Sequence, residues 1–181
     1  MDQSAVLDHL DQMASQFNYD VTYMREILAT SSAAFEGLMS LGRAAAHRES
    51  APLDAWHAAR VMGALAEDCG PCVQLVVDMA RAEGASDSQL EAVIAGDGAA
   101  MTEDVRLAFR FAESVLRKLP EQDEFREEVR RRWGDKGLID LSYGMQIGRV
   151  FPMLKAALGH ARSCQRVTIG GREVRPMEKA A

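Results

Sequence analysis

Two cysteines separated by two residues are the part of this sequence best suited to chemistry. Cys69-Gly70-Pro71-Cys72 places two thiols close enough to form a small disulfide, and the proline stiffens the loop between them. This spacing is typical of a reversible two-electron redox switch, in which one thiolate attacks and the second thiol resolves the product. The same pair could also supply two of the four ligands of a tetrahedral zinc site. The sequence therefore predicts redox chemistry here, with metal binding as the rival interpretation.

Length, charge and cysteine content limit the setting in which this pair acts. The chain has 181 residues, a net charge of −6 and three cysteines. The negative charge disfavours nucleic acid and anionic membranes as partners, and an odd cysteine count disfavours a secreted disulfide framework. The N-terminus lacks the basic and apolar regions of a signal peptide, and no apolar run approaches the ~18 residues of a membrane span. We therefore expect a soluble, cytoplasmic protein that binds neither nucleic acid nor membrane.

The pattern of apolar residues predicts helix over nearly the whole chain. Helix-favouring residues are frequent, whereas β-branched residues are sparse before the C-terminus. We expect N-terminal helices within residues 1–50, a Cys-x-x-Cys core segment over 52–120, C-terminal helices over 121–164 and a tail over 165–181. These segments are expected to form a single all-α domain over 1–181, with a short β-hairpin around the two adjacent glycines of the tail.

The sequence also predicts three details of the helices. Residues 21–47 have the pattern of one long helix rich in small residues, and the last long helix contains Pro152, near which we expect a kink. The basic run at 130–132 lies beside Glu127 and Glu128, so we expect a solvated face there.

The cysteine pair is expected to lie at the start of a helix and to be open to an oxidant. The positive end of the helix dipole and the unpaired N–H groups of the first turn favour a thiolate. Pro71 is tolerated there because an N–H in the first turn has no intrahelical partner. Glu67 and Asp68 precede this helix, and their negative charges oppose the dipole by raising the pKa of a nearby thiol.

The four residues of the motif are those of the thioredoxin active site, but their surroundings predict a different fold. Thioredoxin carries its pair at the end of a buried strand. Here residues 61–68 have the pattern of a helix, and no apolar β-branched strand follows the pair. We therefore interpret the shared motif as a coincidence of chemistry rather than a shared fold.

Several stretches resemble the alkylhydroperoxidase D-like, carboxymuconolactone decarboxylase superfamily. A helix that ends in the cysteine pair is followed by three stretches that resemble those of the family, at residues 79–92, 101–112 and 133–141. The first of them includes Gly84-Ala85-Ser86-Asp87. The resemblance covers well over half of the chain. It implies an all-α helical bundle that assembles into dimers, trimers or hexamers. It also implies thiol-dependent peroxide reduction, with lactone decarboxylation in a branch of the family that lacks the cysteines.

The sequence departs from the family's peroxidase pattern at two positions. That pattern is Glu, eleven residues, Cys, two residues, Cys, three residues, His; here His57 stands in place of the glutamate and Val76 in place of the histidine. Valine cannot relay a proton, so only Cys69 and Cys72 carry over, and in the family the second of them, here Cys72, attacks. His57, whose unperturbed pKa of ~6.5 suits a base, and Glu67 are candidate proton acceptors.

Three functions are compatible with these residues. The first is a thiol-dependent peroxidase or disulfide oxidoreductase, a peroxiredoxin-type antioxidant activity that uses the Cys69/Cys72 pair. It would act on a hydroperoxide or other small molecule and take electrons from a dithiol or disulfide donor, without a cofactor or metal. The second is a non-catalytic or redox-sensing binding module of the same fold. The third is a carboxymuconolactone decarboxylase-like enzyme that acts on a small lactone or acid.

Zinc binding is the alternative interpretation of the cysteine pair. His160 and Cys164 are four residues apart near the end of the last helix, and they would have to complete the site. Cys164 by itself has the pattern of a buried thiol that acts as a small hydrophobe.

Overall fold

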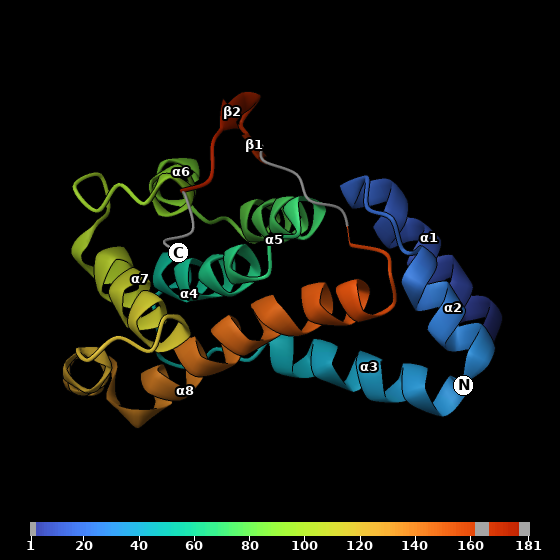
Figure 1. Cartoon of the computed structure of the whole chain (residues 1–181), viewed down its shortest axis with the longest axis horizontal. Helices are drawn as coiled ribbons and strands as arrows, with labels where there is room; N and C mark the ends of the chain where they lie inside the picture. Colours follow the sequence, from blue (N-terminus) through green and yellow to red (C-terminus); the bar gives the residue numbers. More distant parts are fainter. Residues whose placement is uncertain (1–2, 162–166, 178–181) are drawn as a thin grey trace.

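The computed structural model describes residues 3–161 and 167–177. Over these residues the chain forms eight helices and a two-stranded antiparallel hairpin (Figure 1), so the expected all-α fold with a C-terminal hairpin is confirmed. The elements in chain order are α1 (Gln3–Phe17), α2 (Thr22–Thr30), α3 (Ser32–Ala45), α4 (Leu53–Ala66), α5 (Gly70–Ala82), α6 (Asp87–Ala95), α7 (Glu103–Leu116), α8 (Gln122–Ala157), β1 (Val167–Ile169) and β2 (Arg172–Val174). None of the helices in the described segments is both long and apolar enough to cross a membrane.

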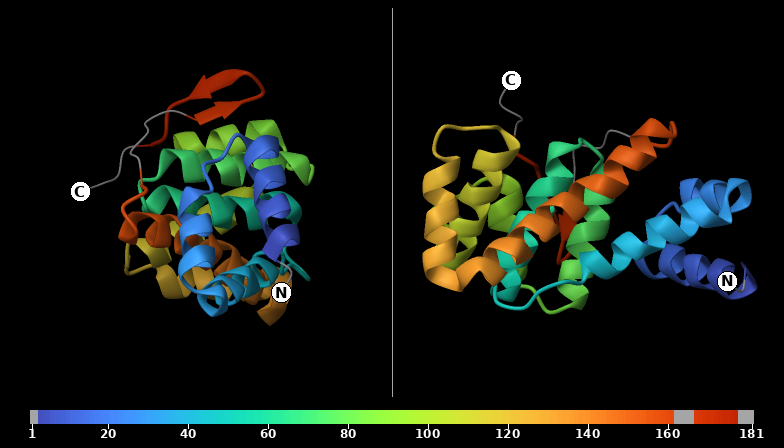
Figure 2. Two further views of the ribbon diagram at one scale, coloured as in Figure 1. Left: turned by 90° about the vertical axis from the view of Figure 1, so that its right-hand side faces the viewer. Right: turned by 90° about the horizontal axis from the view of Figure 1, so that it is seen from below.

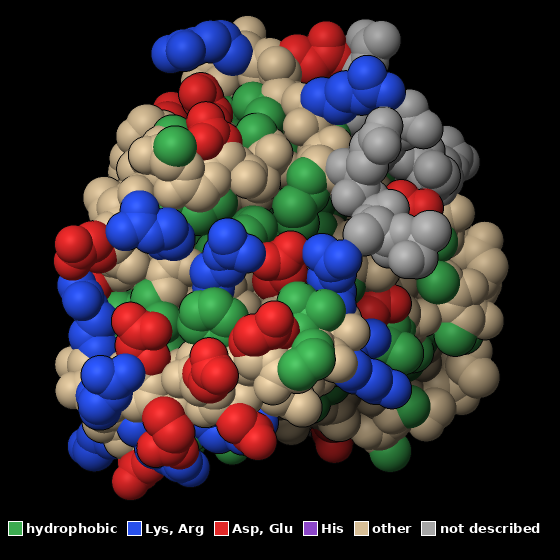
Figure 3. All heavy atoms as spheres, turned by 60° about the vertical axis from the view of Figure 1, so that its left-hand side comes forward, with side chains coloured by type: hydrophobic (Ala, Val, Ile, Leu, Met, Phe, Trp, Pro, Cys, Tyr) green, Lys and Arg blue, Asp and Glu red, His purple; other side chains and the backbone are tan. Residues whose placement is uncertain are grey.

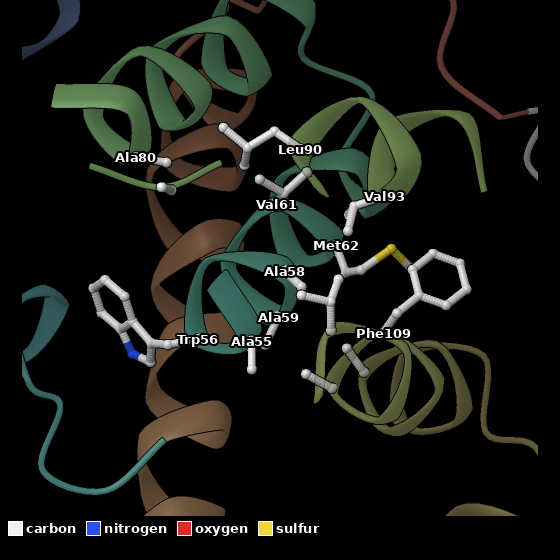
Figure 4. Packing of buried hydrophobic residues seen from close by; sticks show 14 of the residues in the cluster. Ala55, Trp56, Ala58, Ala59, Val61, Met62, Ala80, Leu90, Val93 and Phe109 are labelled. Carbon is white, nitrogen blue, oxygen red and sulfur yellow. The ribbon is translucent and has the colours of Figure 1, made fainter. Parts of the chain in front are cut away.

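Helix α4 lies at the centre of the larger apolar core (Figure 4). Ten of its 14 residues are buried, and it packs against α5, α6, α7 and α8. Ala55, Ala58 and Ala59 are fully buried and let these neighbours approach closely. On another side Met62 lies beside Phe109 of α7. A helix buried on all sides depends on the surrounding bundle for its stability.

Two glycines allow α4 and the second half of α8 to cross with their backbones in contact. A Cβ atom on Gly63 would lie 2.1 Å from the carbonyl oxygen of Met145, and one on Gly148 would lie 2.2 Å from that of Arg60. Any side chain at these positions would force the helices apart. This crossing fixes α8 against the helix whose C-terminal end leads into the cysteine pair.

Helix α8 is interrupted at Gly134 rather than at Pro152. Gly134 has φ 71° and ψ −175°, a conformation that glycine adopts without the steric cost of a Cβ atom, and the helix changes direction there (Figure 1). Pro152 is buried inside the second part of α8. The break at Gly134 separates the C-terminal helices expected over 121–164, and the kink expected near Pro152 stays a prediction.

Residues 21–47 form two helices, not the single helix expected. Helix α2 ends at Thr30, and Ser31 is extended, with φ −156° and ψ 106°. The Ser31 hydroxyl accepts a hydrogen bond from the backbone N–H of Ala34 at 3.2 Å, which caps the start of α3. A serine that bonds to nearby backbone competes with helix continuation. The apolar periodicity on both sides of Ser31 concealed this break.

Helices α1, α2 and α3 build a second apolar cluster at one end of the molecule (Figure 2). Leu10 of α1, Tyr23 of α2 and Phe35 of α3 are buried in it. Leu75 of α5 and Leu154 of α8 pack against the same cluster. The N-terminal helices are therefore attached to the rest of the protein through the beginning of α5 and the end of α8.

The C-terminal hairpin packs on the core through Val167 and Ile169 and bonds to one glutamine of α5. Its turn contains Gly170 (φ 54°) and Gly171 (φ 80°), and two successive positive φ angles are what a tight hairpin turn needs. The side chain of Gln74 accepts a hydrogen bond from Thr168 N at 2.7 Å and donates one to Thr168 O at 2.9 Å. The side-chain amide of Gln74 therefore forms with Thr168 the same kind of paired hydrogen bonds that a neighbouring strand would form.

Acidic and basic side chains are interspersed on the face that Figure 3 shows, which includes α7 and the first part of α8. The basic run at 130–132 is exposed, as expected. Arg130 pairs with Glu127 and Asp135, and Arg132 pairs with Asp104. The run is a solvated, charge-paired face.

Candidate redox site

The cysteine pair lies at the N-terminus of α5, as expected from the sequence. Cys69 is the N-cap residue, with φ −111° and ψ 90°, and Pro71 lies in the first turn. The carbonyl oxygen of Cys69 accepts hydrogen bonds from the N–H groups of Cys72 and Val73, each at 2.9 Å. The two sulfur atoms are bonded to one another, with an S–S distance of 1.98 Å and a Cα–Cα distance of 5.2 Å. The pair therefore has the geometry of a disulfide closed across the start of a helix.

The pair is buried, contrary to the expectation that it is open to an oxidant. Cys69 is 1% exposed and Cys72 is 3% exposed. Part of the cover comes from the turn between α1 and α2: the hydroxyl of Tyr19 lies 3.9 Å from Cys72 Sγ. An oxidant or a reducing thiol can reach the sulfurs only if this cover opens locally, and such openings are ordinary motions of helices at the end of a chain.

A buried lysine holds Tyr19 in this position. Lys155 of α8 is 2% exposed, and its Nζ lies 4.4 Å from the centre of the Tyr19 ring and 5.5 Å from that of Tyr23. The ammonium group also donates a hydrogen bond to the carbonyl oxygen of Asp20 at 3.3 Å. A desolvated ammonium group against aromatic faces is a favourable cation–π arrangement. Burial raises the pKa of Tyr19, so its phenol stays protonated at neutral pH.

Glu67 lies next to the pair in sequence, but its carboxylate faces α8. Arg149 Nε donates a hydrogen bond to Glu67 Oε1 at 2.6 Å, and the Glu67 side chain is 17% exposed. Asp68 follows with φ 54°, a left-handed conformation that aspartate tolerates and that turns the chain from α4 into α5. The ion pair therefore anchors the turn that carries Cys69. It also places a positive charge beside the acidic residues that precede the pair.

His57 is not brought to the sulfurs. It is fully buried in α4, and its Nε2 lies 3.1 Å from Glu83 Oε2, just beyond the C-terminal end of α5. Glu83 follows Cys72 by eleven residues, which corresponds to about 16 Å along a helix. The two candidate centres therefore lie at opposite ends of α5.

The surroundings of His57 keep its imidazole neutral. Burial lowers the pKa of His57 to about 3, and the positive charges of Arg60 and Arg48 contribute in the same direction. The neutral ring can then donate from Nε2 to the carboxylate of Glu83. Arg60 is buried beside it, with its guanidinium 5.5 Å from the centre of the Trp56 ring. In this polar cluster between α4 and α5, Glu83 pairs with both His57 and Arg60, whereas His57 Nδ1 and Arg60 Nε are buried without a hydrogen-bond partner among the described residues.

Among the described residues, the other positions singled out in the sequence do not add ligands to the pair. Val76 is buried one turn after Cys72, where the family has its histidine. His160 Nε2 lies 2.8 Å from Glu26 Oε2, and Cys164 falls outside the described residues. Within residues 3–161 and 167–177, no group of three or more His, Cys, Asp or Glu side chains is placed to hold a metal ion.

The partners that the fold gives to Cys72 and Glu67, namely Tyr19 and Arg149, were not identified from the sequence. Tyr19 and Cys72 are 53 positions apart, and Glu67 and Arg149 are 82 positions apart. The one available signal was Lys155, a cation between the apolar residues of a long helix, which suggests a buried or partnered charge.

Comparisons with known proteins add no relative to this picture. No protein-family model matches the chain, and neither the search of curated proteins nor that of solved structures finds a match. The resemblance to the alkylhydroperoxidase D-like superfamily therefore depends on the residues of this sequence alone.

Proposed function

We propose that this protein is a thiol-dependent peroxidase or disulfide oxidoreductase that works through Cys69 and Cys72. The observation that carries the proposal is the pair itself: two sulfurs within bonding distance at the N-terminus of α5. The phenol of Tyr19 supplies a polar group beside Cys72, and the Arg149–Glu67 ion pair anchors the turn that precedes Cys69. We place this activity in the reducing cytoplasm, where an unreacted pair stays in the dithiol form.

The proposed reaction uses both thiols and transfers two electrons. The Cys72 thiolate attacks one peroxide oxygen, the O–O bond breaks, and the departing alkoxide takes a proton to become an alcohol. Cys72 is then a sulfenic acid. The Cys69 thiol attacks its sulfur, the oxygen leaves as water, and the Cys69–Cys72 disulfide forms. An external dithiol restores the pair by thiol–disulfide exchange and leaves as a disulfide.

Stoichiometric oxidation tests this proposal. The reduced protein, carrying Cys164→Ser so that only the pair can react, is expected to consume one equivalent of tert-butyl hydroperoxide. It should lose both free thiols and about 2 Da in mass, since disulfide formation removes two hydrogen atoms. Intact-mass spectrometry measures the mass, and alkylation with peptide mapping locates the bond. Thiols that persist beside consumed peroxide, or peroxide that persists beside free thiols, would contradict the proposal.

A redox-sensing module without turnover is the second candidate function. Two observations favour it: both sulfurs are buried, and valine stands where a proton relay would be needed. In that case the disulfide would change how the N-terminal helices pack on α5, and the change would be read by a partner.

Replacement of Val76 by histidine separates the two candidates. Val76→His is expected to raise the second-order rate constant with an organic hydroperoxide by about 10- to 100-fold, because a general acid–base group next to the sulfur assists proton transfer. The rate is measured as loss of thiol with time. Val76→Asn, which adds a polar side chain but no titrating group, is the matched control. If the wild type already reacts as fast as Val76→His, the missing relay does not limit the chemistry and the sensor interpretation loses its basis.

A further inference from the structure

We propose that Tyr19 takes over part of the role of the missing histidine, by donating a hydrogen bond to the Cys72 thiolate when the disulfide is reduced. This inference depends on the proposed function, in that Cys72 is the attacking cysteine. It assigns a positioning and charge-stabilising role to a residue outside the cysteine motif. It also gives the N-terminal helices a function at the site.

The contact on which the inference is based is already present in the oxidised protein. Tyr19 Oη lies 3.9 Å from Cys72 Sγ, within hydrogen-bonding range of a sulfur atom, in a buried environment. A disulfide sulfur is a weak acceptor, whereas a thiolate is a charged and strong one. Reduction therefore strengthens this contact. The phenol keeps its proton, since burial raises the pKa of Tyr19, and a protonated phenol next to an anion acts as the donor.

Contacts of both its backbone and its ring hold Tyr19 in position. Its N–H donates to the carbonyl oxygen of Ala14 at 3.1 Å, at the end of α1. The preceding residue, Asn18, has φ 46°, which makes the turn that aims Tyr19 at α5. On the ring face, Lys155 Nζ lies 4.4 Å from the ring centre. A hydroxyl held in this way loses little entropy when it bonds to the thiolate, so more of the interaction stabilises the anion.

The charges around this contact come from three elements. Helix α8 contributes the ammonium of Lys155 and the guanidinium of Arg149, and the turn before α5 contributes Glu67, paired with Arg149, and Asp68. The turn between α1 and α2 contributes Asp20, whose pKa is lowered by its hydrogen bonds with Thr22. Tyr23 of α2 is neutral, because burial raises its pKa. Two basic and three acidic side chains are therefore contributed, and the contact with Cys72 is made by the phenol of Tyr19.

The thiol pKa of Cys72 tests the inference without any peroxide. In a Cys69→Ser, Cys164→Ser background, the rate of alkylation of Cys72 is followed against pH by mass spectrometry, with and without Tyr19→Phe. Phenylalanine keeps the ring and its contact with Lys155 but removes the hydroxyl. We expect the thiol pKa to rise by about one unit, which is the size of one hydrogen bond to a charged group. The rate of alkylation below the thiol pKa should fall by about tenfold.

Tyr23→Phe is the matched control, because Tyr23 is also a buried phenol facing Lys155. Because the Tyr23 side chain also interacts with that of Tyr19, this variant should shift the thiol pKa of Cys72 by less than Tyr19→Phe does. Equal shifts in the two variants, or no shift in Tyr19→Phe, would overturn the inference, provided that thermal unfolding shows both variants folded. A normal Tyr19 effect in a protein inert to hydroperoxides would instead overturn the proposed function. The two failures are therefore distinguishable.

Discussion

The Cys72→Ser variant is expected to lose peroxidase turnover by about three orders of magnitude or more. Serine keeps the shape of the side chain, but its hydroxyl is not ionised near neutral pH and has no sulfur to oxidise. In the proposed reaction Cys72 forms the only bond to the peroxide, so no second group can replace it. Turnover is measured as hydroperoxide consumption coupled to a dithiol reductant at saturating concentration.

The partner cysteine gives the contrast that identifies the attacking residue. Cys69→Ser should still consume one equivalent of hydroperoxide, since Cys72 can form a sulfenic acid that has no resolving thiol. A dimedone-type trapping reagent should label Cys72 in this variant. Cys164→Ser, which removes the only other thiol of the chain, should retain the wild-type rate. If Cys72→Ser were active and Cys69→Ser inert, the order of attack would be reversed.

The position of the cysteine pair at a helix start could be predicted because local sequence determines it. A Pro in the first turn, a change of apolar face and a Cys at the N-cap position are features that the chain carries within a few residues. The hairpin turn at Gly170 and Gly171 is local in the same sense. Such features need no knowledge of the rest of the molecule.

The environment of the pair could not be predicted because distant segments provide it. Tyr19 reaches Cys72 only because α1 and α2 fold back on α5, and Lys155 reaches Tyr19 only because α8 crosses α4 at two glycines. The same limit explains His57. Its spacing from Cys69 fits the family's glutamate position, but antiparallel packing of α4 on α5 places the ring beside Glu83, far along the helix from the sulfurs. Spacing along a sequence does not fix distance across a helix pair.

Burial of the cysteine pair connects access to Cys72 with the hydrogen bond proposed for Tyr19. Tyr19, in the turn between α1 and α2, lies against Cys72, so in the proposed reaction the same segment would limit access to this sulfur and stabilise its thiolate. Opening this cover admits a substrate but removes the hydrogen bond to Cys72. Reactivity should therefore be highest when the opening is small, as in a partial displacement of the turn between α1 and α2.

Asp140→Asn is expected to lower the free energy of unfolding by about 2–4 kcal/mol, the largest effect on stability that we expect from a single isosteric change. Asp140 lies in α8 and is fully buried. Its carboxylate accepts hydrogen bonds from the backbone N–H groups of Glu49 at 3.0 Å, Ser50 at 2.7 Å and Ala51 at 2.9 Å. These three donors belong to the loop that leads into α4.

The physical reason is the charge of the acceptor. All three N–H groups converge on Oδ2 of Asp140, and that of Glu49 also reaches Oδ1. An amide oxygen at the Oδ2 position is a weaker, uncharged acceptor, and its NH2 group replaces the oxygen that Glu49 N–H also reaches, so the charge-assisted part of these hydrogen bonds is lost. Because the loop sets the entry of α4, which lies at the centre of the core, the loss should weaken the bundle as a whole.

Urea denaturation followed by circular dichroism measures this change through the midpoint and slope of unfolding. Asp135→Asn is the matched control: Asp135 lies five residues earlier in α8 and is exposed, with its carboxylate paired to Arg130. Since exposed ion pairs contribute little to stability, this control should leave the unfolding midpoint nearly unchanged. A similarly small effect for Asp140→Asn would mean that the loop from Glu49 to Ala51 finds other acceptors, and that α4 does not depend on the buried carboxylate for its position.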